Sequence, residues 1–390
     1  MYKYIILTCS LLAGIHSLCA QGEDQIMIGT EYMYSSEILN EERAYWVSLP
    51  ESYSETTSSY KTYPILIVLD GHAHFKPVVG MVNYMSTGYN GNRKIPEMIV
   101  VGIQNVNRNR DFTPDKIITT RANVYGGGDK FLSFLEEELI PALDQQYRTV
   151  PYRILFGHSL GGLLAAHTFM KDQTLFNAFI SVDPSFGNWD AAMMDQKLDA
   201  VTEKSFDRFI YLATANWGKR NIRNRDRHVR FYEALNNKSP SKFPGTYEYF
   251  ENEDHGSVPI IAFHNGISSI FQGYDISYRD VDHTAQLIDH FKEISERLSW
   301  EFVPPEALVN RVGYRILRSK NKEDQATAIS FFSMNTENYA DSFNAFDSLG
   351  EAYEAVDNID KAISSYEKSL ALNPENQHAS ARISSLKKVK

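Results

Sequence analysis

The motif Gly157-His158-Ser159-Leu160-Gly161-Gly162 constrains this chain more than any other feature. It lies directly between a short apolar strand-like run, Arg153 to Phe156, and a helical pattern, Leu163 to Met170. A serine between glycines at a tight strand-to-helix turn is typical of a nucleophile elbow. Glycines leave room for the strained serine backbone, and the start of the helix offers the backbone N–H of Leu160 to an oxyanion. The sequence therefore predicts Ser159 as a nucleophile at the edge of a sheet.

A serine hydroxyl needs a general base, and His255 fits this role best among the eleven histidines. It follows the strand-like run Tyr247 to Phe250 and precedes a helical pattern from Ser257 to Phe271, so we expect it on a loop at the same sheet edge. The neighbouring His158 would point away from the serine hydroxyl. The remaining candidates lie in helical patterns, where packing or surface roles are commoner: His264, His283 and His290.

The sequence leaves the acid that would orient His255 open. The order serine, acid, histidine favours Asp226, the first carboxylate after the strand-like run Phe209 to Ala213. Asp226 also lies near the start of a helical pattern, where an acidic side chain simply complements the helix dipole. Asp183, at the end of the preceding strand-like run, and Glu253, two residues before His255, are alternatives, as is a serine-histidine dyad with no acid.

Strand-like runs alternate with helical patterns through the first three quarters of the chain. This rhythm predicts an α/β fold with a mostly parallel central sheet, and several runs are apolar throughout, as strands covered on both faces should be. The runs span residues 45–49, 65–69, 98–102, 153–156, 178–182, 209–213 and 247–250, and the clearest helical pattern spans Asp129 to Gln146.

The pattern changes after Pro304-Pro305, beyond which everything is typical of helix. Two segments align at an offset of 34 residues, the period of a tetratricopeptide repeat. The second copy has the better match, with Leu349-Gly350, Tyr353, Ala362, Tyr366 and Pro374, whereas the first lacks the Leu-Gly pair and keeps Ala328 and Phe332. Two such units bury little core alone, so we expect this region to pack on the first domain or on another chain.

The first twenty residues have the features of a secretory signal peptide: Lys3, a short apolar run, and Ala20 before Gln21. Both cysteines, Cys9 and Cys19, lie within it, so cleavage after Ala20 would leave a cysteine-free protein that folds without disulfides. We therefore expect an exported protein, periplasmic or secreted. Its predicted parts are a signal peptide (residues 1–20), a hydrolase-type domain (21–303) and a helical region (304–390).

Charge and motifs exclude several classes of function. The chain carries 39 Lys and Arg against 49 Asp and Glu, a net charge of −10 that becomes −11 once Lys3 is removed, and this disfavours nucleic-acid binding. No Walker A, dinucleotide or H-E-x-x-H motif is present, so no cofactor or metal is expected. Asp70, His72 and His74 could be taken for a metal triplet, but the loop after this strand is where the backbone N–H of His72 would complete the oxyanion hole.

Two segments bear on the substrate. Arg108 lies on a loop, Asn105 to Pro114, that follows a strand-like run, and Trp217 lies just after another, where it could stack on a sugar or catechol ring. The stretch Lys219 to Arg230 carries six basic residues and one acid. Such a run attracts anionic ligands, although a solvated loop and helix face is the commoner explanation.

From about Ile38 to Tyr274 the chain resembles the esterase branch of the α/β-hydrolases, whose members include ferric enterobactin, feruloyl and acetyl xylan esterases and S-formylglutathione hydrolases. The resemblance rests on the elbow and on three stretches: residues 69–75, 101–114 and 255–259. It implies an α/β-hydrolase fold with Ser159 as nucleophile and His255 as base. Where many relatives carry Glu or Asp after the strand-like run Phe209 to Ala213, this sequence reads Asn216-Trp217-Gly218, so the resemblance does not supply the acid.

These observations predict an exported serine esterase that needs no cofactor and acts on a small-molecule or glycan-linked ester. The substrate is an acyl or feruloyl ester of a polysaccharide or, alternatively, a siderophore lactone. The competing hypothesis is a hydrolase scaffold whose helical tail recruits a partner protein or a second copy of the chain. No nucleic-acid partner is expected, nor any membrane attachment after signal cleavage.

Overall fold

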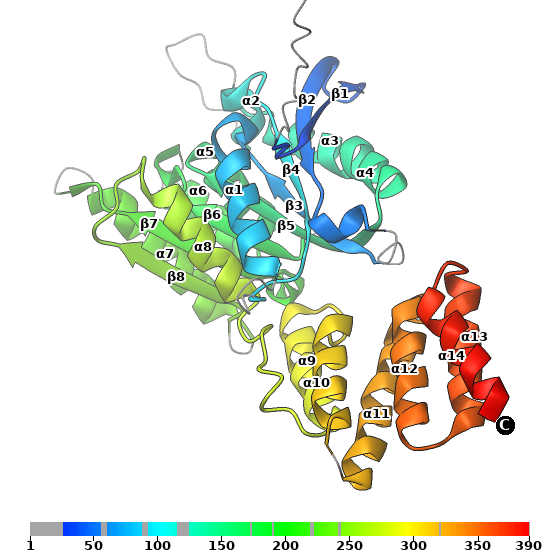
Figure 1. Cartoon of the computed structure of the whole chain (residues 1–390). Coiled ribbons are helices and arrows are strands. Elements are labelled where there is room, and N and C mark those ends of the chain that lie inside the picture. Colours follow the sequence, from blue (N-terminus) through cyan, green and yellow to red (C-terminus); the bar gives the residue numbers. More distant parts are fainter. Residues whose placement is uncertain are drawn as a thin grey trace, which may run out of the picture.

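The computed structural model in Figure 1 describes residues 26–55, 61–87, 93–114, 125–171, 174–188, 191–218, 222–240, 243–319 and 321–389. The predicted signal peptide, residues 1–20, lies outside these ranges and stays a prediction. Within the described ranges, no helix has both the length and the apolar character needed to cross a membrane.

One eight-stranded sheet forms the centre of the molecule (Figure 1). Its strand order is β1-β2-β4-β3-β5-β6-β7-β8, with antiparallel pairing at β1–β2 and β2–β4 and parallel pairing from β4 to β8. The prediction of a mostly parallel sheet is therefore confirmed. The strands are β1 (Thr30–Ser36), β2 (Glu41–Ser48), β3 (Tyr63–Val68), β4 (Ile99–Ile103), β5 (Thr149–His158), β6 (Ala178–Val182), β7 (Phe209–Ala215) and β8 (Gly245–Phe250).

Helices cover both faces of the sheet, which explains the uninterrupted apolar runs of β3, β4 and β6. One face packs against α1 (Gly71–Ser86) and α8 (Val258–Ile270). The other packs against α3 (Gly128–Phe134), the π-helical turn η4 (Leu135–Leu139), α4 (Ile140–Gln146), α5 (Leu160–Met170), α6 (Ala191–Asp199) and α7 (Ile222–Lys238). The short helix α2 (Arg108–Phe112) follows β4.

Strand β1 has no counterpart among the runs expected from the sequence. Its seven residues, Thr-Glu-Tyr-Met-Tyr-Ser-Ser, are mostly exposed or half-buried because the strand forms the edge of the sheet and pairs only with β2. An edge strand of this composition lacks the apolar density that marks the central strands.

The last hundred residues are helical and extend away from the sheet (Figure 1). They form α9 (Thr284–Leu298), α10 (Glu306–Leu317), α11 (Lys322–Asn338), α12 (Phe343–Ala355), α13 (Ile359–Leu372) and α14 (Gln377–Val389). The run of helices thus begins at α9, before the predicted boundary at residue 304. That these helices form tetratricopeptide repeats stays a prediction.

A glycine lets the helices approach closely in both pairs, α10–α11 and α12–α13. A Cβ atom on Gly350 would lie 2.7 Å from the ring of Tyr366, and one on Gly313 would lie 2.7 Å from the ring of Phe332. Tyr366 and Phe332 stand 34 residues apart, but Gly350 and Gly313 stand 37 apart. The small residue of the first pair therefore lies about one helical turn earlier, so a comparison at an offset of 34 does not find it.

The helical region packs on the sheet domain through a continuous apolar cluster that runs from β3 and β5 through α9 to α12. At this junction the ring of Tyr152, at the start of β5, lies 5.4 Å from that of Phe302. A cleft of about 830 Å³ is lined by Tyr63 and Val150 from the sheet domain and by Trp300 and Asn310 from the helical region. The helical region therefore lies at the amino ends of β3 and β5.

Candidate active site

Five neighbouring strands place polar or aromatic side chains at one edge of the sheet. Asp70 follows β3, Ser159 follows β5, Asp183 follows β6, Trp217 follows β7 and His255 follows β8. Because these strands run parallel, their carboxyl ends meet at the same edge. The structure thus brings the predicted nucleophile and base to one edge.

The backbone of Ser159 is strained in the manner expected of an elbow, with φ 60° and ψ −115°. Two glycines make this turn feasible: a Cβ atom on Gly157 would lie 2.2 Å from the carbonyl oxygen of Gly161, and one on Gly162 would lie 2.8 Å from that of Val182. Asp70 (φ 52°) and Asp183 (φ 40°) also adopt positive φ. Such strain persists only where the surroundings impose it, and it gathers at functional sites.

The hydroxyl groups of Ser159 and Ser185 lie 3.2 Å apart, within hydrogen-bond distance. The backbone N–H of Ser185 also donates to the carbonyl oxygen of Ser159. No hydrogen bond between Ser159 and His255 is formed among the described residues. The His255 ring nevertheless lies close by, 4.3 Å from the ring of His158, which precedes the serine. Contacts between a nucleophile and its base are often loose without substrate, so this spacing is compatible with the predicted roles.

The carboxylate that bonds His255 is Asp183, and this corrects the expectation of Asp226. His255 Nδ1 lies 2.5 Å from Asp183 Oδ2, and the Asp183 side chain is completely buried. The backbone N–H of Ala215 donates to the other oxygen, Oδ1, at 3.2 Å. With Nδ1 held in this way, the Nε2 atom of His255 is left for the nucleophile.

Asp226 is turned away from His255 because of its position on α7. That helix buries His228 completely, and Asp226, two residues earlier, faces the opposite side and is exposed. Asp226 lines a hollow of about 410 Å³ together with Trp217, Arg225 and Tyr249. Glu253, the other alternative, receives the backbone N–H of Asn216 on its carbonyl oxygen and forms no bond to His255 among the described residues.

Trp217 contacts both members of the His255–Asp183 pair. Its indole N–H donates to Asp183 Oδ2 at 2.7 Å, the same oxygen that His255 contacts, and its ring lies 4.7 Å from the imidazole. The sequence predicted Trp217 as a surface on which a substrate ring stacks. In the structure its indole N–H bonds Asp183, while 42% of the residue remains exposed at the site.

The surroundings of Asp183 keep it ionised. Burial alone would raise its pKa, but the hydrogen bond with His255, the nearby His228, and the N–H groups of Trp217 and Ala215 outweigh burial, and the pKa is lowered. His228 lies behind the acid, with Nε2 2.7 Å from the carbonyl oxygen of Pro184 and Nδ1 2.8 Å from the hydroxyl of Thr214. Sequence reasoning missed His228, because nothing in its basic helical context distinguishes it.

His158 forms the other wall around His255. Burial, followed by the nearby His255 and His74, lowers the pKa of His158 to about 4. Its buried Nε2 atom has no hydrogen-bond partner in the described part of the chain, and its ring meets that of His74 edge-on at 5.7 Å. His255 therefore contacts the rings of both Trp217 and His158, and His158 is neutral near neutral pH.

Arg108, predicted to contact substrate, links Asp70, the residue before α1, to the elbow. Its guanidinium bonds both oxygens of Asp70, at 2.6 and 3.0 Å, and the carbonyl of His158 at 3.2 Å. Asn105 Nδ2 also donates to Asp70, at 2.5 Å. With its carboxylate engaged in this way, Asp70 has little capacity left to bind a metal. It directly precedes α1, whose first turn carries the N–H of His72.

Two arginines of the basic stretch after Trp217 contact neighbouring residues. Residues 219–221 lie outside the described ranges. Arg225 stacks on Tyr249, with its guanidinium carbon 3.9 Å from the ring centre, and Arg230 forms an ion pair with Asp195. These contacts support the interpretation of a solvated loop and helix face.

Comparison with known proteins agrees with this arrangement. The family model described as "Putative esterase" matches residues 36–239. The chain is 28% identical over 256 residues to the ferri-bacillibactin esterase BesA of Bacillus subtilis, covering 60% of this chain and 87% of BesA. It is 27% identical over 194 residues to a siderophore triacetylfusarinine C esterase of Aspergillus fumigatus, covering 43% of this chain and 65% of that protein.

Among solved structures, an IroE-like serine hydrolase from Shewanella oneidensis superposes with a TM-score of 0.68 and 26% identity, covering 80% of this chain and 99% of that one. Fold and site thus define an ester hydrolase of the α/β-hydrolase class. The chain belongs to the esterase family whose model spans residues 36–239.

Proposed function

We propose that the protein is an exported serine esterase that works through Ser159, His255 and Asp183. The observation that carries the proposal is the short contact between His255 Nδ1 and the buried Asp183, at the sheet edge where Ser159 is held in an elbow. An aspartate in this position fixes the tautomer of the histidine and stabilises the imidazolium that forms during the reaction.

The reaction follows the acyl-enzyme route. His255 Nε2 takes the proton of the Ser159 hydroxyl as its oxygen attacks the ester carbonyl. The resulting oxyanion is bound by the backbone N–H groups of Leu160 and His72, which belong to the first turns of α5 and α1 and have no partner within those helices. His255 then protonates the leaving alcohol, and water releases the acid from Ser159 by the reverse steps.

For the substrate we propose a siderophore ester rather than an acyl or feruloyl ester of a polysaccharide. The sequence left both open, and two of the relatives described above carry names of siderophore esterases. The exposed face of Trp217 beside His255 suits an aromatic ring such as a catechol. Turnover of a catecholate trilactone, methyl ferulate and an acetylated sugar compares the substrates directly, with the lactone expected to have the highest kcat/KM.

Labelling with a fluorophosphonate probe tests the mechanism. We expect wild-type protein to be labelled and Ser159→Ala not to be. Ser185→Ala is the matched control, because Ser185 contacts Ser159 but is not proposed to form the acyl-enzyme. An unlabelled wild type, or equal labelling of Ser159→Ala, would contradict the proposal and favour the scaffold hypothesis.

A further inference from the structure

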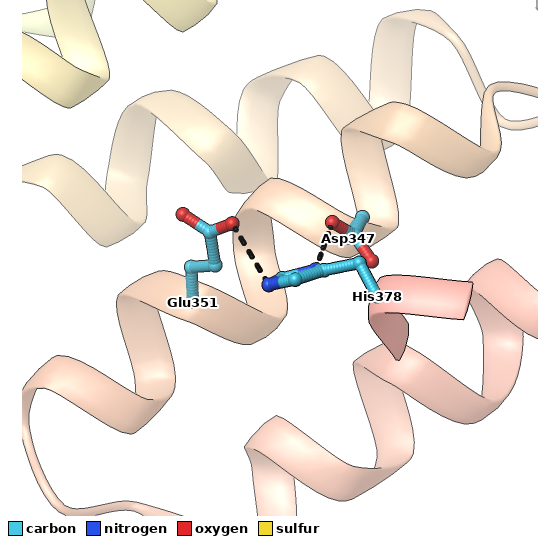
Figure 2. Close-up of side chains that lie close together, drawn as sticks. All are labelled: Asp347, Glu351 and His378. Carbon is cyan, nitrogen blue, oxygen red and sulfur yellow. Dashed lines mark hydrogen bonds and ion pairs between the residues drawn. The ribbon is translucent and has the colours of Figure 1, made fainter. Parts of the chain in front are cut away.

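A second group of histidine and carboxylate side chains lies in the helical region (Figure 2). Asp347 and Glu351 stand one turn apart on α12, and His378 projects toward them from the first turn of α14. His378 Nδ1 lies 2.8 Å from Asp347 Oδ2, and Nε2 lies 3.6 Å from Glu351 Oε1. We propose that these three residues bind a divalent transition-metal ion, of which Zn²⁺ suits the ligands best.

The three side chains lie close enough to become ligands of one ion after a small shift of Glu351 and His378. One ligand atom from each residue can be chosen so that all lie within 4.8 Å of one another. The ligands of a tetrahedral zinc ion, with bonds of about 2.0–2.1 Å, lie roughly 3.3 Å apart. Glu351 and His378 are partly exposed, with side chains 35% and 46% accessible, so they have room to close on an ion while water takes the fourth position.

The charge of the group also favours a cation. Within the described ranges neither Asp347 nor Glu351 has a Lys or Arg nitrogen within 4.0 Å, and each forms an ion pair only with His378. This sets them apart from Glu354 on the same helix, which pairs with Arg382. Two carboxylates facing one imidazole leave negative charge uncompensated, and a divalent ion would neutralise it.

Asp347 is held in place before any ion binds. Asn376 Nδ2 donates to Asp347 Oδ1 at 2.9 Å and to Ser369 Oγ at 2.9 Å, which leaves Asp347 Oδ2 facing His378. The ring of the fully buried Tyr366 meets the His378 ring edge-on at 5.9 Å. Such outer contacts orient metal ligands and are worth about 10–100-fold in affinity.

The type of ion follows from the donor atoms. An imidazole nitrogen with two carboxylate oxygens suits Zn²⁺ and its first-row neighbours, whereas Mg²⁺ and Ca²⁺ prefer oxygen ligands alone. The bound ion would join α14 to α12, and the reaction at Ser159 would not involve it.

Calorimetric titration of ZnCl₂ into chelator-treated protein at pH 7.5 tests the site. We expect one Zn²⁺ per chain in the wild type and at least tenfold weaker binding in His378→Ala and in Glu351→Gln. Glu351→Gln removes a ligand without changing the shape of α12. His264→Ala is the matched control, because His264 is also exposed but contacts only Asn265 among the described side chains.

Limited digestion with trypsin provides a second readout. Zn²⁺ should slow cleavage after Arg382 and Lys387 in α14 of the wild type several-fold, but not in His378→Ala. Absence of saturable Zn²⁺ binding below about 1 mM, or unchanged binding in both His378→Ala and Glu351→Gln, would overturn the proposal, as would equal Zn²⁺ protection of His378→Ala.

Discussion

Two histidine–carboxylate pairs in this protein use similar contacts for different purposes. His255 meets a completely buried aspartate, whereas His378 meets Asp347, whose side chain is 14% accessible. The second ring nitrogen makes the difference. In His255 the second nitrogen forms no hydrogen bond with a described residue, while in His378 it faces another carboxylate, Glu351. The partner of the second nitrogen therefore distinguishes a candidate base from a candidate metal ligand.

Replacing His255 and His378 in turn should give the largest difference in activity between the two sites. We expect His255→Ala to lower kcat for ester hydrolysis by roughly 10⁶-fold, since the general base is lost. His378→Ala should leave kcat and KM unchanged, because α14 lies in the helical region. Steady-state kinetics on p-nitrophenyl acetate measures both, and a similar loss in the two variants would refute the division of roles.

Replacing the carboxylate of Asp183 by an amide should give the next largest effect on kcat. Asp183→Asn should lower kcat by about 10³-fold or more, because an amide cannot stabilise the imidazolium and favours the wrong tautomer of His255. Asp226→Asn is the matched control and should retain activity, as its side chain is exposed and forms no bond with His255. If Asp226→Asn were the more damaging change, Asp183 would not be the acid.

The half-buried His158 makes the stability of the protein depend on pH. Its pKa of about 4 lies below the value of about 6.5 expected for an unfolded chain. The unfolded state therefore binds the proton first, and the stability contributed by neutral His158 is present above pH 6.5 and lost as pH falls toward 4. As the pH falls, His158→Gln should therefore lose up to about 3 kcal/mol less unfolding free energy than the wild type.

Urea denaturation of wild type and His158→Gln at pH 7 and pH 4.5 measures that difference. His378→Gln serves as the control, because it replaces a histidine on α14, away from the active site. The same pH dependence of the unfolding free energy in wild type and His158→Gln would contradict the role given to His158.

Trp217 offers the smallest and most specific test. Trp217→Phe keeps an aromatic ring against His255 but removes the N–H that bonds Asp183. A hydrogen bond to a charged group contributes about 1.5–3 kcal/mol. We expect the loss of this one to lower kcat by about tenfold. If KM rose instead while kcat stayed constant, Trp217 would act mainly on the substrate, as the sequence suggested.

The sequence revealed the parts of this site that local patterns encode. Ser159 could be found because glycines, a strand and a helix surround it, and His255 because it directly follows a strand. Asp183 and His255 lie 72 residues apart in the sequence. The order serine, acid, histidine had favoured a carboxylate after the next strand. The positive φ of Asp183 is also not visible in the sequence.

The roles of the surrounding side chains were harder to predict, because pairing decides them. The sequence predicted that Arg108 contacts substrate, but it gave no indication that two nitrogens of its guanidinium would bond the buried Asp70. The fold class followed from the alternation of strands and helices, whereas β1 went unseen because an edge strand needs few apolar residues.

The position of the helical region has a practical consequence. It lies at the amino ends of β3 and β5, and Ser159 lies at the opposite end of β5. A tether attached to α14 would therefore hold the protein by the face opposite the one where the ester enters. Immobilised in that orientation, the enzyme should meet its substrate as freely as it does in solution.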